Sequence, residues 1–93
     1  MDRSALTPHA RVRMQQRGIR AAALDALLEY GVERYVHSQG REIVFLDKKA
    51  RARLARQSPE GARAAERLGR TYAIVGDGVV ITVGHRYRRI PRD

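Results

Sequence analysis

The first third of the chain carries apolar and polar residues with a helical period over residues 8–17. Thr7 stands where its side chain can cap the first free backbone N–H groups, and Pro8 suits the first helical position because it has no N–H to lose. Gly18 suits the left-handed residue that closes a helix. The pattern therefore predicts one short helix with its own start and stop signals.

A polar stripe runs along this helix. At about 100° per residue, His9, Arg13 and Arg17 fall at neighbouring angles, between Met14 on one side and Val12 on the other. Because both shoulders are apolar, we expect the stripe to line a cleft. A histidine held beside arginines there can do acid–base chemistry on an anion. The alternative is a histidine at a helix start that makes only local hydrogen bonds.

A second helix is expected from residue 20 to residue 30, where Gly31 stops it. Its start lacks a good capping side chain, since Arg20 occupies a place that usually holds Ser, Thr or Asp. One face of this helix is apolar and points to a core, and it consists of Ala23, Leu24, Leu27 and Leu28.

The period then changes to two, which is typical of strands. Residues 32–37 and 41–46 form a first hairpin around a turn at 38–40, and residues 70–76 and 79–85 form a second around Asp77-Gly78, a strong two-residue turn signal. That turn predicts four pairs: Gly76 with Val79, Ile74 with Ile81, Tyr72 with Val83, and Arg70 with His85. Tyr72, Val83 and His85 would then share one face, and Ala73, Val80 and Thr82 the other.

A basic segment separates the two hairpins. Asp47 caps a helix over residues 48–57, and Ser58 starts a second, shorter helix that ends at Gly69. Few large apolar groups occur here, so a surface helix pair over the sheet edge and a partly mobile segment both stay open. We expect one α+β domain over residues 1–93: two N-terminal helices on a roughly four-stranded, mostly antiparallel sheet, with a basic helical insertion before the last hairpin.

Charge is the strongest signal in the composition. The 93 residues carry 19 basic and 10 acidic side chains, a formal net charge of +9, and 17 of the basic side chains are arginine. Arginine presents a planar fork of donors that matches phosphate, so a nucleic-acid partner is favoured. The plainer alternative is a basic surface that only aids solubility or reflects an arginine-favouring genome.

Several classes of protein do not fit the composition. The chain has no cysteine, which excludes disulfides and thiolate metal sites. It has no apolar run near the roughly 20 residues that span a bilayer, so we expect no membrane partner. Residues 1–4 lack the apolar core of a secretory signal, and a cytoplasmic location is expected. The histidines lack metal-ligand spacing, and we expect neither a metal nor another cofactor.

A second histidine stands at the end of the last strand, where His85 follows Gly84 and precedes Arg86. Two histidines on opposite sides of a phosphate could share the base and acid roles. With His9, Arg13, Arg17 and His85 as catalytic candidates, the chemistry suits RNA: the ribose 2′-OH attacks the adjacent phosphate when a base removes its proton. The nucleic-acid-binding candidates lie in the basic segment and the tail: Lys48, Lys49, Arg53, Arg86, Arg88 and Arg89.

Two stretches carry a family resemblance. His9-Ala10-x-x-Arg13-Met14-x-x-Arg17-Gly18-Ile19 resembles the opening motif of the bacterial domain-of-unknown-function family numbered 4258, and residues 72–83 resemble its closing hairpin. The family is similar in fold to the small metal-independent ribonucleases and toxins of the barnase/RelE/colicin type. The resemblance implies that His9, Arg13 and Arg17 match the first motif, that Thr82 and the following basic residues match the last, and that an antitoxin-type protein is a partner.

Two interpretations follow. The first is a small basic RNA-binding protein that acts as a metal-independent, RelE-like, toxin-like endoribonuclease. The second is a non-catalytic module that binds nucleic acid or another partner through the basic segment and the tail. The basic segment, residues 48–70, is longer than we expect for the family, and the sequence leaves its role open. It also leaves open whether the protein forms a homo-oligomer.

Overall fold

The structure is a computed structural model, which describes residues 5–36 and 40–86. The described residues form an α+β fold, as predicted, with four α-helices and a four-stranded antiparallel sheet in the order β1-β2-β3-β4. The elements are, in chain order, α1 (Pro8–Arg17), α2 (Ala21–Tyr30), β1 (Val32–Val36), β2 (Arg41–Phe45), α3 (Lys48–Ala55), α4 (Pro59–Arg67), the 3₁₀ turn η1 (Leu68–Arg70), β3 (Thr71–Gly76) and β4 (Val79–His85).

The predicted helix starts are confirmed. The Thr7 hydroxyl accepts a hydrogen bond from the Ala10 N–H at 3.0 Å, and Asp47 and Ser58 cap α3 and α4 in the same way. Gly18 closes α1 with a left-handed φ of 65°. Arg20 precedes α2 without a side-chain cap, as its residue type predicted.

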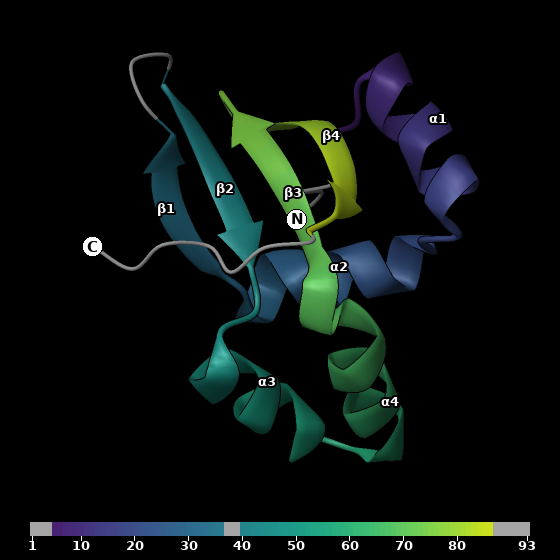
Figure 1. The fold of residues 1–93 in the computed structure, drawn as a ribbon, viewed down its shortest axis with the longest axis vertical. Coiled ribbons are helices and arrows are strands. Elements are labelled where there is room, and N and C mark those ends of the chain that lie inside the picture. The colour runs from purple at the N-terminus through teal and green to yellow at the C-terminus, as the bar shows by residue number, and fades with distance from the viewer. Residues whose placement is uncertain (1–4, 37–39, 87–93) are drawn as a thin grey trace.

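The helices gather on one side and at one end of the sheet (Figure 1). α1 packs beside β4, α2 crosses behind the strands, and α3 and α4 pack against one another beyond the end where β2 finishes and β3 begins. The basic segment is therefore a packed helix pair, which resolves the two alternatives left by the sequence. None of the described helices is long and apolar enough to cross a membrane.

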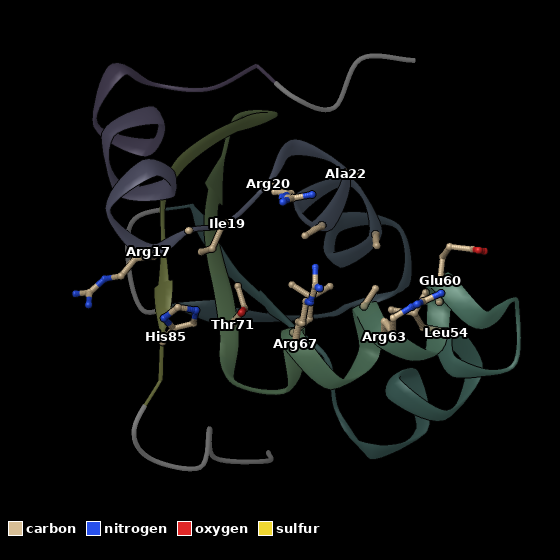
Figure 2. Close-up of a pocket in the computed structure, with 16 residues that line it drawn as sticks. Arg17, Ile19, Arg20, Ala22, Leu54, Glu60, Arg63, Arg67, Thr71 and His85 are labelled. Atoms are coloured by element: carbon tan, nitrogen blue, oxygen red, sulfur yellow. The ribbon is translucent and has the colours of Figure 1, made fainter.

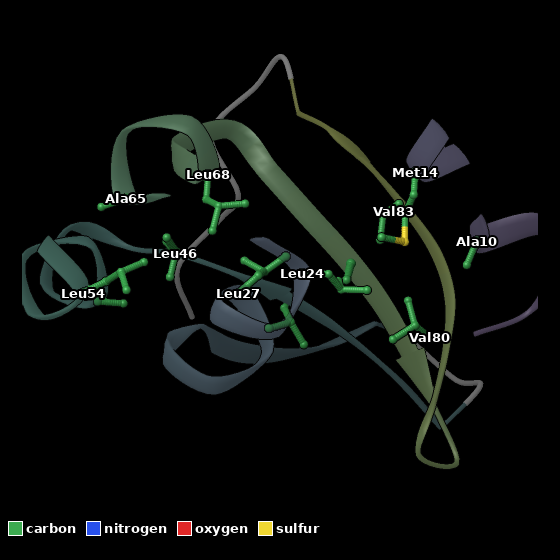
Figure 3. Close-up of a cluster of buried hydrophobic side chains, with 13 residues drawn as sticks. Ala10, Met14, Leu24, Leu27, Leu46, Leu54, Ala65, Leu68, Val80 and Val83 are labelled. Carbon is green, nitrogen blue, oxygen red and sulfur yellow. The ribbon is translucent and has the colours of Figure 1, made fainter. Parts of the chain in front are cut away.

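The core lies between the sheet and these helices (Figure 3). α2 contributes the fully buried Leu24 and Leu27, α3 contributes Leu54, and η1 contributes Leu68. Alanine and valine make up most of the rest. The other buried apolar residues of this cluster are Ala10, Met14, Val44, Leu46, Ala50, Ala65, Ala73, Val80 and Val83.

The register of the last hairpin differs from the prediction. Gly76 pairs with Val79 as expected, and the Asp77-Gly78 turn has positive φ at both residues. A β-bulge then leaves Ile81 without a partner in β3, so the three other predicted pairs are wrong. The observed pairs beyond the bulge are Ile74 with Thr82, Ala73 with Val83, Tyr72 with Gly84, and Thr71 with His85.

The bulge changes which side chains face the helices, because one extra residue inverts the alternation of a strand. Val83 and His85 now share the helix-facing side with Ala73, and Val83 is completely buried. Thr82, expected on the side of Ala73, instead pairs with Ile74 on the face away from the helices. Thr7 stabilises the bulge, because its hydroxyl donates a hydrogen bond to the Ile81 carbonyl at 2.7 Å.

Candidate nucleic-acid interface

A cleft of about 640 Å³ opens between the α1–α2 connection and α4 (Figure 2). Arg17 and Arg20 border it on one side, and Arg63 and Arg67 border it on the other. The ends of β3 and β4 close it below. We call it the α2–α4 cleft.

The end of α1 places the first wall of the α2–α4 cleft, which carries Arg17 and Arg20. The left-handed Gly18 turns the chain, and the Ile19 N–H returns a 2.8 Å hydrogen bond to the Met14 carbonyl. α2 begins three residues after Gly18, and Ala22 and Ala23 of its first turn line the cleft. Because no side chain caps α2, its free N–H groups and the positive end of its dipole lie at this wall, an arrangement that favours anions.

The second wall is α4, which lies close against α3. Gly61 makes the close approach: a Cβ there would come within 2.3 Å of the Leu54 carbonyl oxygen. With Gly61 and Ala65 turned inward, Arg63 and Arg67 lie one helical turn apart on the cleft side. Figure 2 shows both side chains extending from α4 beside the cleft. The sequence showed the charge of this segment but not this orientation.

The floor consists of Thr71 and His85, which are direct partners in the β3–β4 pair. Thr71 is 1% exposed and lies at the bottom of the cleft, where its hydroxyl is a potential hydrogen-bond donor. His85 is half-buried beside it, placed on this side of the sheet by the bulge at Ile81.

A second hollow of about 620 Å³ adjoins the first around η1, and we call it the η1 hollow. Its arginines are Arg51, Arg67, Arg70 and Arg86, with Glu66 as the carboxylate among them. Arg67 and His85 line both the η1 hollow and the α2–α4 cleft. The two sites are thus neighbours separated by these two side chains.

Arg86 is held firmly at the η1 hollow. Its guanidinium donates to the Gly69 carbonyl at 3.0 Å and lies 5.1 Å from the centre of the Phe45 ring. Its backbone N–H donates to the Arg70 carbonyl at 2.7 Å. Burial, and secondarily the charge of Arg51, lowers the pKa of Arg86. Both causes disfavour the charged form of this side chain.

Arginines outnumber carboxylates in both sites. Among the described residues, each site is lined by four arginines and one glutamate, Glu60 in the cleft and Glu66 in the hollow. Within the part of the chain that the structure describes, none of these arginines forms an ion pair. Unpaired guanidinium groups around two adjoining concavities form a site for an anion with more than one negative centre.

The predicted catalytic residues are divided by the fold. Arg17 and His85 both line the α2–α4 cleft, whereas His9 and Arg13 line neither site. α1 starts beside Val80, where Thr7 pairs with β4, and ends near His85. Eight residues of helix separate His9 from Arg17, about 12 Å at 1.5 Å per residue. His9 is exposed at the far end of α1, and Val12, expected to form an apolar shoulder, is 49% exposed.

The predicted nucleic-acid-binding residues are also scattered. Arg86 lines the η1 hollow, but the exposed Lys48, Lys49 and Arg53 on α3 line neither site. Thr82 is half-buried on the face of the sheet away from the helices. Arg88 and Arg89 lie outside the described residues.

The fold adds residues to the cleft that the sequence pattern did not indicate. Arg63, Arg67, Arg51 and Arg70 stood out only as charge of the basic segment, and Thr71 carried no signal as the first residue of a strand. The signal that could have found Arg63 and Arg67 is their four-residue spacing on the side of the helix opposite the small Gly61 and Ala65.

Comparison with protein-family models, curated proteins and solved structures found no match to this chain. Among the described residues, no group of three or more histidine, aspartate or glutamate side chains could hold a metal ion. The arginines of the site can bind phosphate oxygens, and His85 can exchange a proton.

Proposed function

We propose that the protein binds single-stranded RNA by its phosphate backbone at the α2–α4 cleft. One observation carries the proposal: four arginines without ion pairs among the described residues, the uncapped start of α2 and the buried hydroxyl of Thr71 surround one concavity beside His85. Guanidinium groups, helix N-termini and hydroxyls are the donors that phosphate oxygens accept from.

A nucleic acid suits the site better than a small anion. The basic side chains that give the formal charge of +9 are not confined to the cleft. Their combined electrostatic field attracts a polyanion along its length. A protein of this kind binds through counterion release, so its affinity must fall steeply with salt.

Cleavage of the bound RNA is a second candidate function, and the position of His85 favours it. His85 lies between the arginines of both sites, where a phosphate would be held. It would take the proton of the ribose 2′-OH as that oxygen attacks the adjacent phosphorus. The bond from phosphorus to the 5′-oxygen would break, and His85 would return the proton to that oxygen. The products are a 2′,3′-cyclic phosphate and a free 5′-OH, with Arg17 and Arg67 stabilising the charge of the transition state.

Binding is tested by fluorescence anisotropy with a 2′-O-methyl oligouridine, which cannot undergo this cleavage. We expect Arg17→Ala/Arg67→Ala to weaken binding about a hundredfold, on the basis of about 1.4 kcal/mol for each charged hydrogen bond removed. The control, Arg11→Ala/Arg56→Ala, removes the same charge from exposed positions outside the cleft. Equal weakening in the two double variants would show that only net charge matters and would overturn the proposal.

Cleavage is tested separately with unmodified RNA in EDTA. His85→Ala should abolish the 2′,3′-cyclic phosphate product while leaving the affinity for the 2′-O-methyl RNA within about threefold. His9→Ala is the matched control and should cleave like the wild type. Cleavage that persists in His85→Ala, or its absence from the wild type, removes the catalytic candidate and leaves the binding proposal standing.

The resemblance to toxin-type ribonucleases stays a prediction from the two sequence motifs. If the protein acts in that way, an antitoxin-type partner with acidic side chains would cover the α2–α4 cleft. We propose the cytoplasm as its compartment, where its RNA is found.

A further inference from the structure

The η1 hollow and the α2–α4 cleft share a wall. Arg67 and His85 line both, while the remaining arginines belong to one site or the other. Anions held in the two sites would lie on either side of the same two side chains. This arrangement matches two phosphates that follow one another along one strand.

We propose that the η1 hollow binds the phosphate that neighbours the one in the α2–α4 cleft. The protein therefore recognises an oligonucleotide with at least two consecutive phosphates, not a mononucleotide. This inference rests on the proposed function, because it takes the first phosphate site as given.

The η1 hollow has the features of a prepared anion site. Its four arginines face a single carboxylate, Glu66, and none of them is ion-paired among the described residues. Arg86 is fixed by the Gly69 carbonyl and by the Phe45 ring, so little side-chain freedom is left to lose on binding. Its pKa is lowered by burial, and the attraction of a bound anion would offset that penalty.

The close approach of Arg51 to η1 supports the same interpretation. A Cβ at Gly69 would lie 3.3 Å from Cζ of Arg51, so this guanidinium lies over the turn that holds Arg86. Two like charges are thus held near one another, and Arg51 contributes to the lowered pKa of Arg86. Such an arrangement is costly when empty and becomes favourable when an anion lies between the cations.

The experiment compares ligands that differ by one phosphate. The probes are 2′-O-methyluridine 3′-monophosphate and its dimer and trimer with 3′-phosphates, which carry one, two and three phosphates. Titrations at low salt measure the dissociation constant of each. We expect the second phosphate to raise the affinity at least tenfold and the third to add less than threefold, because the two sites hold two phosphates.

The variant Arg51→Ala/Arg70→Ala removes cations found only in the η1 hollow. It should abolish the tenfold step while leaving the affinity for the monophosphate within about twofold. The control Arg11→Ala/Arg56→Ala should retain the step. If the double variant loses its fold by circular dichroism, the single Arg70→Gln variant replaces it, since Arg70 is exposed.

The outcomes separate the two proposals. Binding of all three ligands without a step between one and two phosphates would overturn the second phosphate site and leave the first. Equal loss of this affinity step in Arg51→Ala/Arg70→Ala and in the control Arg11→Ala/Arg56→Ala would also overturn the second phosphate site and leave the first. No binding of any ligand, with none gained by lowering the salt, would overturn the proposed function itself.

Discussion

The Thr7 hydroxyl donates a 2.7 Å hydrogen bond to the carbonyl of Ile81, the residue of β4 that has no partner in β3. The same hydroxyl accepts the N–H of Ala10 and caps α1. One side chain thus starts the helix that ends at Arg17 and fixes the bulge that turns His85 toward the same cleft. The position of the proposed site depends on this link between the two ends of the chain.

Replacing Thr7 by valine tests that link. Thr7→Val keeps the shape but removes the cap and the hydrogen bond to Ile81, so we expect a decrease of about 2 kcal/mol in the free energy of unfolding. Urea denaturation measures it. Thr7→Ser keeps the hydroxyl and should lose less than about 0.5 kcal/mol by the same principles. A serine variant as unstable as the valine variant would show that the hydroxyl has no such role.

The contact between α3 and α4 gives a second prediction. A methyl group at Gly61 would meet the backbone carbonyl of Leu54, which can move only if the helices separate. Gly61→Ala should therefore destabilise the protein by about 1–3 kcal/mol, as overpacking does. Gly69→Ala is the control, because its methyl group would meet only the flexible end of Arg51. The prediction is wrong if thermal unfolding ranks Gly69→Ala as the more damaging change.

Two carboxylates on neighbouring strands give a pH dependence. The pKa of Glu42 is raised, first by the hydrogen bond that its protonated form makes with Glu33, then by burial and the charge of Glu33. A raised pKa means that the folded protein binds this proton more tightly, so the stabilisation is present at low pH and is lost as pH rises through the folded pKa. Glu42→Gln should therefore raise the unfolding temperature at pH 7.

The gain from Glu42→Gln should disappear below about pH 4, where Glu42 is protonated in both states. Unfolding temperatures measured from pH 3 to pH 8 for the wild type and the variant check this. Glu29→Gln, which changes an exposed carboxylate on α2, is the control. A gain that stays constant with pH would mean that Glu33 and Glu42 do not share a proton.

Arg67 gives the clearest prediction on binding, because it lines both sites. Arg67→Ala should weaken binding of the 2′-O-methyl oligouridine at least tenfold, since it removes charged hydrogen bonds. The slope of log affinity against log salt should become shallower by roughly 0.7 for each phosphate that the variant no longer neutralises. Arg56→Ala, at the exposed end of α3, should change the affinity less than threefold. An unchanged slope in Arg67→Ala would place the phosphates elsewhere.

The sequence predicted the elements better than the site. Capping residues such as Thr7 and Ser58, and the turn at Asp77-Gly78, act over a few residues and are visible locally. The bulge is not local: Ile81 is β-branched and apolar like its neighbours, and the residue that holds it lies 74 positions away. The predicted register therefore failed beyond Val80.

Contacts between distant residues also explain why the candidate site could be predicted only in part. His9, Arg13 and Arg17 form one stripe in the sequence pattern, but a helix of ten residues is long enough for its two ends to face different surroundings. Arg63 and Arg67 acquire their role from the packing of Gly61 against Leu54, which only the folded chain shows. The number of arginines could be counted from the sequence, but their convergence around one cleft could not be predicted from it.

RNA phosphates are proposed to bind around Arg67 and His85, and an NMR titration of the isotopically labelled protein with 2′-O-methyl oligouridine tests this most directly. We expect the largest amide shift changes to cluster at Arg17, Arg67, Thr71 and His85, with small changes on the outer face of α3 around Lys49 and Arg53. Changes centred on that face of α3, with the residues beside His85 unaffected, would contradict it.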